Sequence, residues 1–401
     1  MLKRTFKAFQ YRDFRLMWLG ACTSSIGTWM QQLAQNWLVF ELSKSPRMLG
    51  LDAFLGQIPI LLLSLLGGVI ADRRDRRHLL IASQFIQMAC ALTLTALLVT
   101  KTVQVWHILT MSFVVGIAQA FGGPAYQALI PRLVKGEDLQ NAIALNSIQF
   151  NLARVIGPVI GGIAMTKLGA EWCFGLNALS FVAVIISLVR LHERFTPAES
   201  NMSVLESMKE GIRFVRRREG LEPLIVIAFF MTMLGVPLIG FLPVFAKDVF
   251  HLGPDAYSIL LSVSGLGSVA GALIVAGTGN VQRKGKVTLM ILMFLGVLIA
   301  CFANSSAFWL SCVILFVGGA ALIASFAMIS SLVQLIATDE MRGRVMSVYN
   351  VAFRGGMPIG SLVTGQLITM TSAPLAISIN GALLAIIGAW FLFAHRRVAK
   401  L

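Results

Sequence analysis

The sequence is poor in charged residues. Asp, Glu, Lys and Arg make up only 13% of its 401 residues, whereas 57% are hydrophobic. A soluble domain carries about 25% charged residues, so this chain cannot cover a water-facing surface. Its apolar runs extend over about 20 residues, which suits transmembrane helices and is too long for the alternating strands of a β-barrel. We therefore predict an all-α integral membrane protein.

Several chemical signals are also missing. The five cysteines lie inside apolar runs without a C-x-x-C pair, so we expect small buried thiols and no metal site. A G-x-x-x-x-G-K-[ST] phosphate loop does not occur, which argues against ATP as the driver, and we expect neither a cofactor nor an enzyme. Lys and Arg number 33 against 18 Asp and Glu. In a membrane protein this excess gathers on the cytoplasmic side and does not indicate nucleic acid.

Hydropathy predicts twelve membrane spans. They cover residues 15–40, 48–70, 78–100, 106–130, 140–166, 171–191, 223–246, 256–278, 287–303, 307–336, 344–370 and 374–394. With the N-terminus in the cytoplasm, the predicted cytoplasmic segments hold 26 Lys and Arg residues and the outer ends hold five. Because basic residues mark the cytoplasmic side, this split predicts that both termini are cytoplasmic.

One long polar stretch divides the chain. It predicts an N-terminal half at 1–191, a cytoplasmic linker at 192–222 and a C-terminal half at 223–401. Within the linker, Ser203 and Glu206 fit a capping box that opens an amphipathic helix. This helix lies either on the inner leaflet or in a solvated linker.

The two halves repeat weakly. Arg154 and Pro158 recur 200 residues later as Arg354 and Pro358. These matches fall in spans five and eleven, where a duplication of six spans would place them. Two similar halves around a central cavity are the layout of an alternating-access transporter.

The loop between spans two and three carries a family signature. It reads Gly67-Gly68-Val69-Ile70-Ala71-Asp72-Arg73-Arg74-Asp75-Arg76-Arg77. This resembles G-x-x-x-D-R-x-G-R-R of the major facilitator superfamily, with Asp75 in place of the second glycine. The resemblance implies twelve transmembrane helices in two pseudo-symmetric six-helix halves. It also implies a cytoplasmic gate that contacts span eleven near residues 339–344, formed by Gly68, Asp72, Arg73, Arg76 and Arg77. A merely basic loop is the alternative, and it does not explain Asp72.

Span five carries a second family feature. Its run Arg154-Val155-Ile156-Gly157-Pro158-Val159-Ile160-Gly161-Gly162 resembles the antiporter motif, which is common in proton-driven exporters. Gly157 and Gly161 form a G-x-x-x-G face that allows another helix to approach closely. Pro158 leaves the carbonyl of Arg154 without its helical donor. Gly162 completes the motif. The competing interpretation is ordinary helix packing by glycine and proline.

Within the superfamily, the chain resembles bacterial exporters of the enterobactin and macrolide efflux branch. The residues concerned are Gly27-Thr28-Trp29, Asn36-Trp37-Leu38-Val39, Asn141-Ala142, the two motifs above and Arg342-Gly343-Arg344-Val345-Met346-Ser347. Thr28 stands where many members of this branch have Asp, so this position offers no carboxylate for proton coupling.

Charged and polar groups within the spans are the remaining candidates. An intramembrane charge costs about 2.5–3.5 kcal/mol on insertion scales and is a functional candidate by default. Arg154 and Arg354 could bind an anionic group or organise a gate, or be satisfied by freed carbonyls and glutamines. Asp52 is the candidate for a carboxylate that takes up a proton, and a solvated helix-end Asp is the alternative. Neutral candidates for a substrate cavity, with helix–helix hydrogen bonding as their competing role, are Gln31, Gln35, Tyr126 and Asn350.

These observations favour a monomeric, proton-coupled exporter, an antiporter, in the bacterial inner membrane. Its substrate would be a small organic or amphipathic compound such as a drug or siderophore. A flippase for lysolipids or other lipids, a solute importer of the same fold and a non-transporting sensor are the alternatives.

Overall fold

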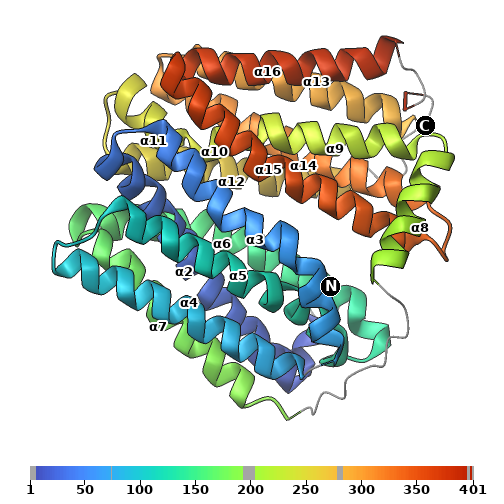
Figure 1. The fold of residues 1–401 in the computed structure, drawn as a ribbon, viewed down its shortest axis with the longest axis horizontal. Helices are drawn as coiled ribbons and strands as arrows, with labels where there is room; N and C mark the ends of the chain where they lie inside the picture. Colours follow the sequence, from blue (N-terminus) through green and yellow to red (C-terminus); the bar gives the residue numbers. More distant parts are fainter. Residues whose placement is uncertain (1–5, 74, 193–203, 278–282, 395–397, 400–401) are drawn as a thin grey trace. The chain divides into compact units, whose positions relative to one another are not determined.

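The computed structural model describes residues 6–73, 75–192, 204–277, 283–394 and 398–399. All the regular elements in these ranges are helices (Figure 1). In the first part of the chain they are η1 (Lys7–Gln10), α2 (Arg12–Ser43), α3 (Pro46–Arg73), α4 (Arg76–Val99), α5 (Val105–Leu129), η2 (Ile130–Arg132), η3 (Gly136–Asp138), α6 (Leu139–Lys167) and α7 (Ala170–Val189). The later elements are α8 (Val204–Arg217), α9 (Leu221–Gly235), α10 (Pro237–Gly240), α11 (Leu242–Val244), η4 (Phe245–Val249), α12 (Pro254–Gly277), α13 (Lys284–Ala303), α14 (Phe308–Ile336), α15 (Arg342–Met370), α16 (Ala373–Ala389) and η5 (Trp390–Ala394).

The prediction of an all-helical membrane protein is confirmed. Ten of the twelve predicted spans coincide with helical stretches that are both long and apolar enough to cross a membrane. The other two predicted spans are α2, with 32 residues, and α15, with 29. Both exceed the ~20 residues that a bilayer requires, but they are more polar than the rest. The two most polar long helices are thus those that carry Gln31, Gln35, Asn350 and Arg354.

The chain forms two compact units. One comprises Met1–Ser43 and Leu55–Asn201, and the other comprises Lys44–Phe54 and Met202–Leu401. The boundary therefore runs through α3, whose first turns belong with the second unit. There, a Cβ atom on Gly50 would lie 2.4 Å from the carbonyl oxygen of Ser361 in α15, so the two backbones are in close contact.

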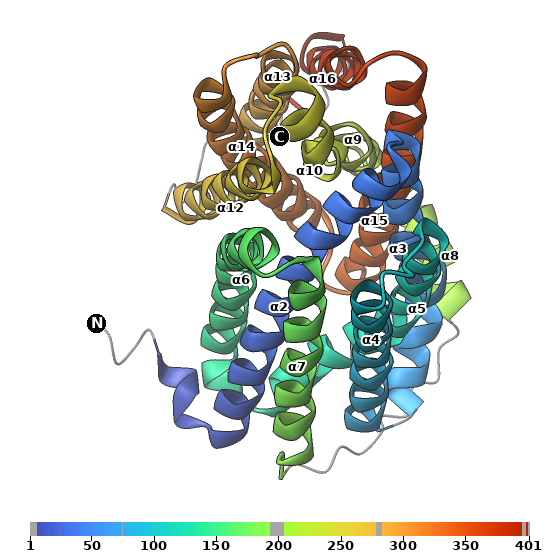
Figure 2. The same ribbon diagram turned by 90° about the vertical axis from the view of Figure 1, so that its left-hand side faces the viewer.

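The same helix pairs recur in both units. In the first unit, α2 packs against α6 and α7, and α4 packs against α5 and α7 (Figure 2). In the second unit, α9 packs against α15, and α13 packs against α14 and α16. The pairs α2·α6, α4·α5 and α4·α7 of the first unit therefore correspond to α9·α15, α13·α14 and α13·α16 of the second. Such a correspondence is expected for a duplicated architecture.

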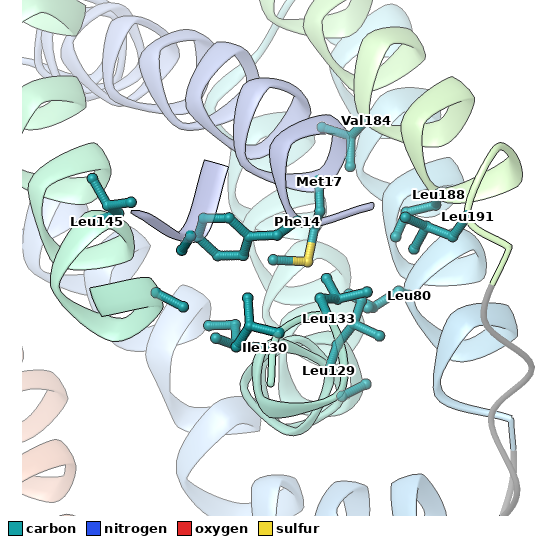
Figure 3. Packing of buried hydrophobic residues seen from close by; sticks show 14 residues of the cluster. Phe14, Met17, Leu80, Leu129, Ile130, Leu133, Leu145, Val184, Leu188 and Leu191 are labelled. Atoms are coloured by element: carbon teal, nitrogen blue, oxygen red, sulfur yellow. The ribbon is translucent and has the colours of Figure 1, made fainter. Parts of the chain in front are cut away.

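A buried core closes one end of the first unit. It brings together the start of α2, the end of α5 and the end of α7, with contributions from α4 and α6 (Figure 3). Its large members include Phe14, Met17, Leu80, Leu129, Ile130, Leu133, Leu145, Val184, Leu188 and Leu191. Burial of apolar surface supplies about 25 cal/mol per Å². This core therefore holds the ends of α2, α5 and α7 together.

A buried carboxylate lies beside this core. Asp138, which is 2% exposed, forms a 2.8 Å ion pair with Lys7 Nζ. Its Oδ2 also accepts hydrogen bonds of 2.9 Å from Gln10 Nε2 and Tyr11 Oη. The hydrogen bond with Asp138 raises the pKa of Lys7. Sequence reasoning missed this group, because an acid in a charged loop is usually solvated.

Asp138→Asn is expected to lower the Tm of the purified protein. The amide removes the negative charge and one of the two acceptor oxygens that hold η1 in place, and hydrogen bonds to an ionised group are about twice as strong as neutral ones. Fluorescence-monitored unfolding in detergent measures the effect. The neighbouring acid Glu137 is exposed, so Glu137→Gln is the matched control. Equal shifts for the two variants would contradict a structural role for Asp138.

Candidate functional site

The family-signature loop is built around the start of α4. Asp75 Oδ1 accepts a 2.8 Å hydrogen bond from the Arg77 backbone, and Asp75 Oδ2 lies 3.1 Å from His78 Nδ1. An aspartate at this N-cap satisfies a backbone N–H group that has no partner inside the helix and stabilises the positive end of the helix dipole. The departure from the signature glycine therefore has a local structural role.

Two arginines of the signature contact the ends of neighbouring helices. Arg77 donates to the carbonyl of Val189 and, at 3.3 Å, to that of Leu191, at the end of α7. Arg76 donates to the carbonyl of Ala128 near the end of α5, at 3.4 Å. Carbonyls at helix C-termini lack helical donors and carry the negative end of the dipole. The arginines thus hold the start of α4 against α5 and α7.

The glycine in close contact is not the one that the signature suggests. A Cβ atom on Gly67 would lie 2.2 Å from the carbonyl oxygen of Ala120 in α5, whereas one on Gly68 would have no neighbour within 4 Å among the described residues. Asp72 and Arg73 end α3, but their side chains, like all of Arg74, lie outside the described residues. The predicted contact of this loop with span eleven therefore stays a prediction.

Residues 339–344, which were predicted to contact the family-signature loop, form ion pairs inside the second unit. Arg342 pairs with Asp339 at 2.6 Å, and Arg344 pairs with Glu210 of α8 at 2.5 Å. A Cβ atom on Gly211 would lie 2.8 Å from the carbonyl oxygen of Arg344, and Val215, one turn later, is buried. One face of the amphipathic helix α8 therefore packs on α15, and the other face is exposed. Ser203 of the predicted capping box lies outside the described residues.

In the first unit, the glycines of span five pack against α2. A Cβ atom on Gly157 would lie 2.5 Å from Trp29 Cβ, and one on Gly161 would lie 3.1 Å from Met30 Cα. Pro158 and Gly162 are buried on the same helix. The absence of side chains at 157 and 161 therefore lets α6 and α2 approach closely.

This close approach places the Arg154 guanidinium over an aromatic ring. Its Cζ lies 5.7 Å from the centroid of the Trp29 ring, which in turn makes an edge contact with Phe150 at 6.1 Å. Arg154 is half-buried, and within the described residues it forms no ion pair with an acid. A cation–π contact contributes about 0.5–2 kcal/mol. The contact with the Trp29 ring holds the Arg154 guanidinium in place but does not neutralise its positive charge.

The corresponding helix of the second unit uses different glycines. A Cβ atom on Gly356 would lie 2.4 Å from the Phe229 carbonyl oxygen, and one on Gly360 would lie 2.0 Å from that of Met233, both on α9. Gly356 and Gly360 follow Arg354 by two and six residues. Gly157 and Gly161 follow Arg154 by three and seven residues, so the glycine pair of the second unit is shifted by one position. Sequence reasoning missed it by aligning the prolines, although the G-x-x-x-G spacing was visible.

The shift changes what the second arginine contacts. One residue turns an α-helix by about 100°. Arg354 is accordingly exposed, and Asn350, one turn earlier, is exposed on the same face of α15. The two arginines that the repeat made equivalent therefore have different environments.

Three of the four neutral side chains predicted to line a cavity are engaged in helix–helix hydrogen bonds. Gln31 Oε1 accepts from Asn177 Nδ2 at 2.6 Å, joining α2 to α7. Gln35 Nε2 donates to Ser112 Oγ at 2.9 Å, joining α2 to α5. Tyr126 Oη donates to Asn146 Oδ1 at 2.6 Å, between α5 and α6. The competing role that the sequence left open is thus observed for all three side chains.

Two further expectations need correction. Asp52 is 3% exposed, so the alternative of a solvated helix-end carboxylate is wrong. All five cysteines are free thiols, but only Cys90, Cys173 and Cys312 are buried, and Cys301 is exposed. An exposed thiol in α13 is compatible with a lipid-facing position, because the surrounding solvent is then apolar.

Comparison with known proteins establishes the family. A family model described as "Transmembrane secretion effector", of the major facilitator type, matches residues 3–400. The chain belongs to the transmembrane secretion effector family. Members of this major facilitator family are transporters, so this member is a multi-pass membrane transporter and not an enzyme.

Relatives of this transporter include efflux proteins. Macrolide efflux protein A of Streptococcus pyogenes is 23% identical over 358 residues, which cover 88% of each chain. The staphyloferrin A transporter of Staphylococcus aureus is 25% identical over 93% of this transporter and 94% of its own chain. Among solved structures, a bacterial homologue of the lysosomal transporter Spinster superposes with a TM-score of 0.75 at 15% identity, covering 97% of each chain. This last likeness shows the shared fold.

Proposed function

We propose that the protein is a proton-coupled exporter of a small organic or amphipathic compound, such as a drug or siderophore. It would work by alternating access between halves at 1–191 and 223–401 joined by the linker at 192–222. It would act as a monomer in the bacterial inner membrane with both termini in the cytoplasm. Similarity to macrolide efflux protein A over 88% of each chain supports export as the direction.

The observation that carries this proposal is the environment of Arg154. A guanidinium inside a membrane-spanning helix is costly. Here it lies over Trp29 and has no acidic partner among the described residues. Such a group attracts an anionic or hydrogen-bond-accepting part of a solute, and the adjoining rings of Trp29 and Phe150 provide apolar surface. This combination suits an amphipathic organic molecule.

Asp52 is the proposed proton carrier. It is buried in the part of α3 that groups with the second unit. It lies two residues after Gly50, whose backbone contacts α15, and therefore on another face of α3. A buried carboxylate that gains or loses a proton changes the charge inside the protein, so proton uptake would be coupled to a rearrangement of the groups around it. One proton charge moved across the membrane supplies about 2.3 kcal/mol per 100 mV.

The test is substrate-triggered proton flux in proteoliposomes under an imposed pH gradient. The wild type and Asp52→Asn are challenged with siderophores, macrolides, cationic dyes and lysolipids, and Glu41→Gln, an exposed acid at the end of α2, serves as the matched control. We expect flux in the wild type and the control and its loss in Asp52→Asn.

Three other outcomes would contradict parts of the proposal. Unchanged flux in Asp52→Asn would remove Asp52 as the carrier. Flux triggered by lysolipids alone would favour a flippase, and solute accumulation in right-side-out vesicles would favour an importer. The packing of Gly211 of α8 on α15 covers part of the apolar face of this amphipathic helix with protein, which weakens the lipid alternative.

A further inference from the structure

The second unit contains a cavity that the proposed mechanism does not use. Its volume is about 630 Å³, within the range of about 300–1,000 Å³ that is typical of small-molecule sites. It lies where α3 and α16 begin and where η4 and α15 end, away from the end of α15 that contacts α8. Its lining residues are Lys44, Ser45, Pro46, Val244, Asp248, Val249, Ile368, Thr369, Ser372, Ala373 and Pro374.

Irregular backbone shapes this cavity. Lys44 has a left-handed φ of 48°, which turns the chain sharply between α2 and α3. Phe245–Val249, which also contribute to the lining, form a single π-helical turn after α11. Such turns are rare inside helices and often occur at functional sites. Ser372 begins α16 by accepting a hydrogen bond from the Leu375 backbone at 3.3 Å.

The cavity carries one charge of each sign on a wall of polar and apolar residues. Lys44 and Asp248 are both exposed, and within the described residues neither forms an ion pair. Lys247 and His251 act on Asp248 electrostatically but do not neutralise it by direct contact. The partly exposed apolar residues of the lining are Pro46, Val249 and Pro374. Both charges are thus available to a solute in the same cavity.

We propose that this cavity binds a drug-sized organic zwitterion. Its anionic group would lie at Lys44, its cationic group at Asp248, and its apolar body along the wall between them. A molecule with a single charge would leave one of the two side chains without a partner. By the distribution of basic residues the cavity lies at the outer end of the unit, so this inference rests on the proposed function and supplies an exit site for the exported compound.

The test uses ciprofloxacin, a fluorescent zwitterion, together with its methyl ester, which keeps only the cation, and its N-acetyl derivative, which keeps only the anion. Binding to the full chain is measured by fluorescence anisotropy in nanodiscs of phosphatidylethanolamine and phosphatidylglycerol. Lys44→Gln and Asp248→Asn remove the charges singly. Lys101→Gln is the matched control, because Lys101 is also exposed, also has a positive φ, of 57°, and lies outside the cavity.

We expect each cavity variant to raise the Kd of the zwitterion about fivefold, as for an exposed ion pair. Lys44→Gln should weaken the N-acetyl derivative but not the ester, and Asp248→Asn should do the reverse. Equal affinities in all variants, or no binding of the zwitterion, would overturn the site. Export in proteoliposomes is measured separately. Flux with unaltered binding would reject the cavity and retain the exporter, whereas charge-dependent binding without flux would do the opposite.

Discussion

Arg154→Gln should lower export by about ten- to a hundredfold. Loss of a hydrogen bond to a charged group costs about 1.5–3 kcal/mol. The guanidinium lies over Trp29, and in the described part of the chain it has no acid to neutralise it, so its charge remains available to substrate. Export rates in everted vesicles, normalised to the amount of protein in the membrane, provide the measurement.

Two comparison variants sharpen this expectation. Arg154→Lys keeps the charge but loses the planar group that lies over the ring, so it should restore part of the activity. Arg354→Gln should cause a smaller loss, because Arg354 is exposed and occupies a different face relative to its glycine pair. Equal losses at 154 and 354 would show that the two arginines act equivalently despite their environments.

Gly67→Ala should cause a large loss of stability. The added Cβ atom would lie 2.2 Å from the backbone oxygen of Ala120, so α3 and α5 would have to separate. Overpacking typically costs about 1–3 kcal/mol, and here no side-chain rotation can relieve it. We expect a lower Tm and a smaller monodisperse fraction on size-exclusion chromatography in detergent.

The adjacent residue provides the control. A Cβ atom on Gly68 would have no neighbour within 4 Å in the described part of the chain. Alanine is favoured over glycine inside a helix by about 0.5–1 kcal/mol, so Gly68→Ala should keep or raise the Tm. If Gly68→Ala were the more damaging of the two, the close contact of α3 with α5 would not be the reason for the paired glycines.

Hydropathy was sufficient for the helices because each span is a local property of about 20 residues. It could not place the start of α3. The membership of Lys44–Phe54 in the second unit depends on the contact of Gly50 with Ser361, more than 300 residues away. Local composition contains no information about such a contact. The predicted halves therefore follow the order of the chain, whereas the compact units of the structure place Lys44–Phe54 with the second half.

The candidate site was predicted less completely, for a geometric reason. Matching Arg154 with Arg354 by their prolines ignored a shift of one position between the glycine pairs, and one position rotates a helix by about 100°. Likewise, the sequence around Gln31 and Gln35 is the same whether these side chains line a cavity or join helices by hydrogen bonds. Only the positions of Asn177 and Ser112 distinguish the two roles.

The divided helix α3 limits how the transporter can be separated into parts. A polypeptide that begins after the linker lacks Lys44–Phe54, a segment of its own folded unit. The surface of α15 around Ser361 and Gly365 would then meet acyl chains in place of the Gly50 backbone. Two half-genes would therefore have to be expressed together, with the N-terminal polypeptide supplying the missing helical turns in trans.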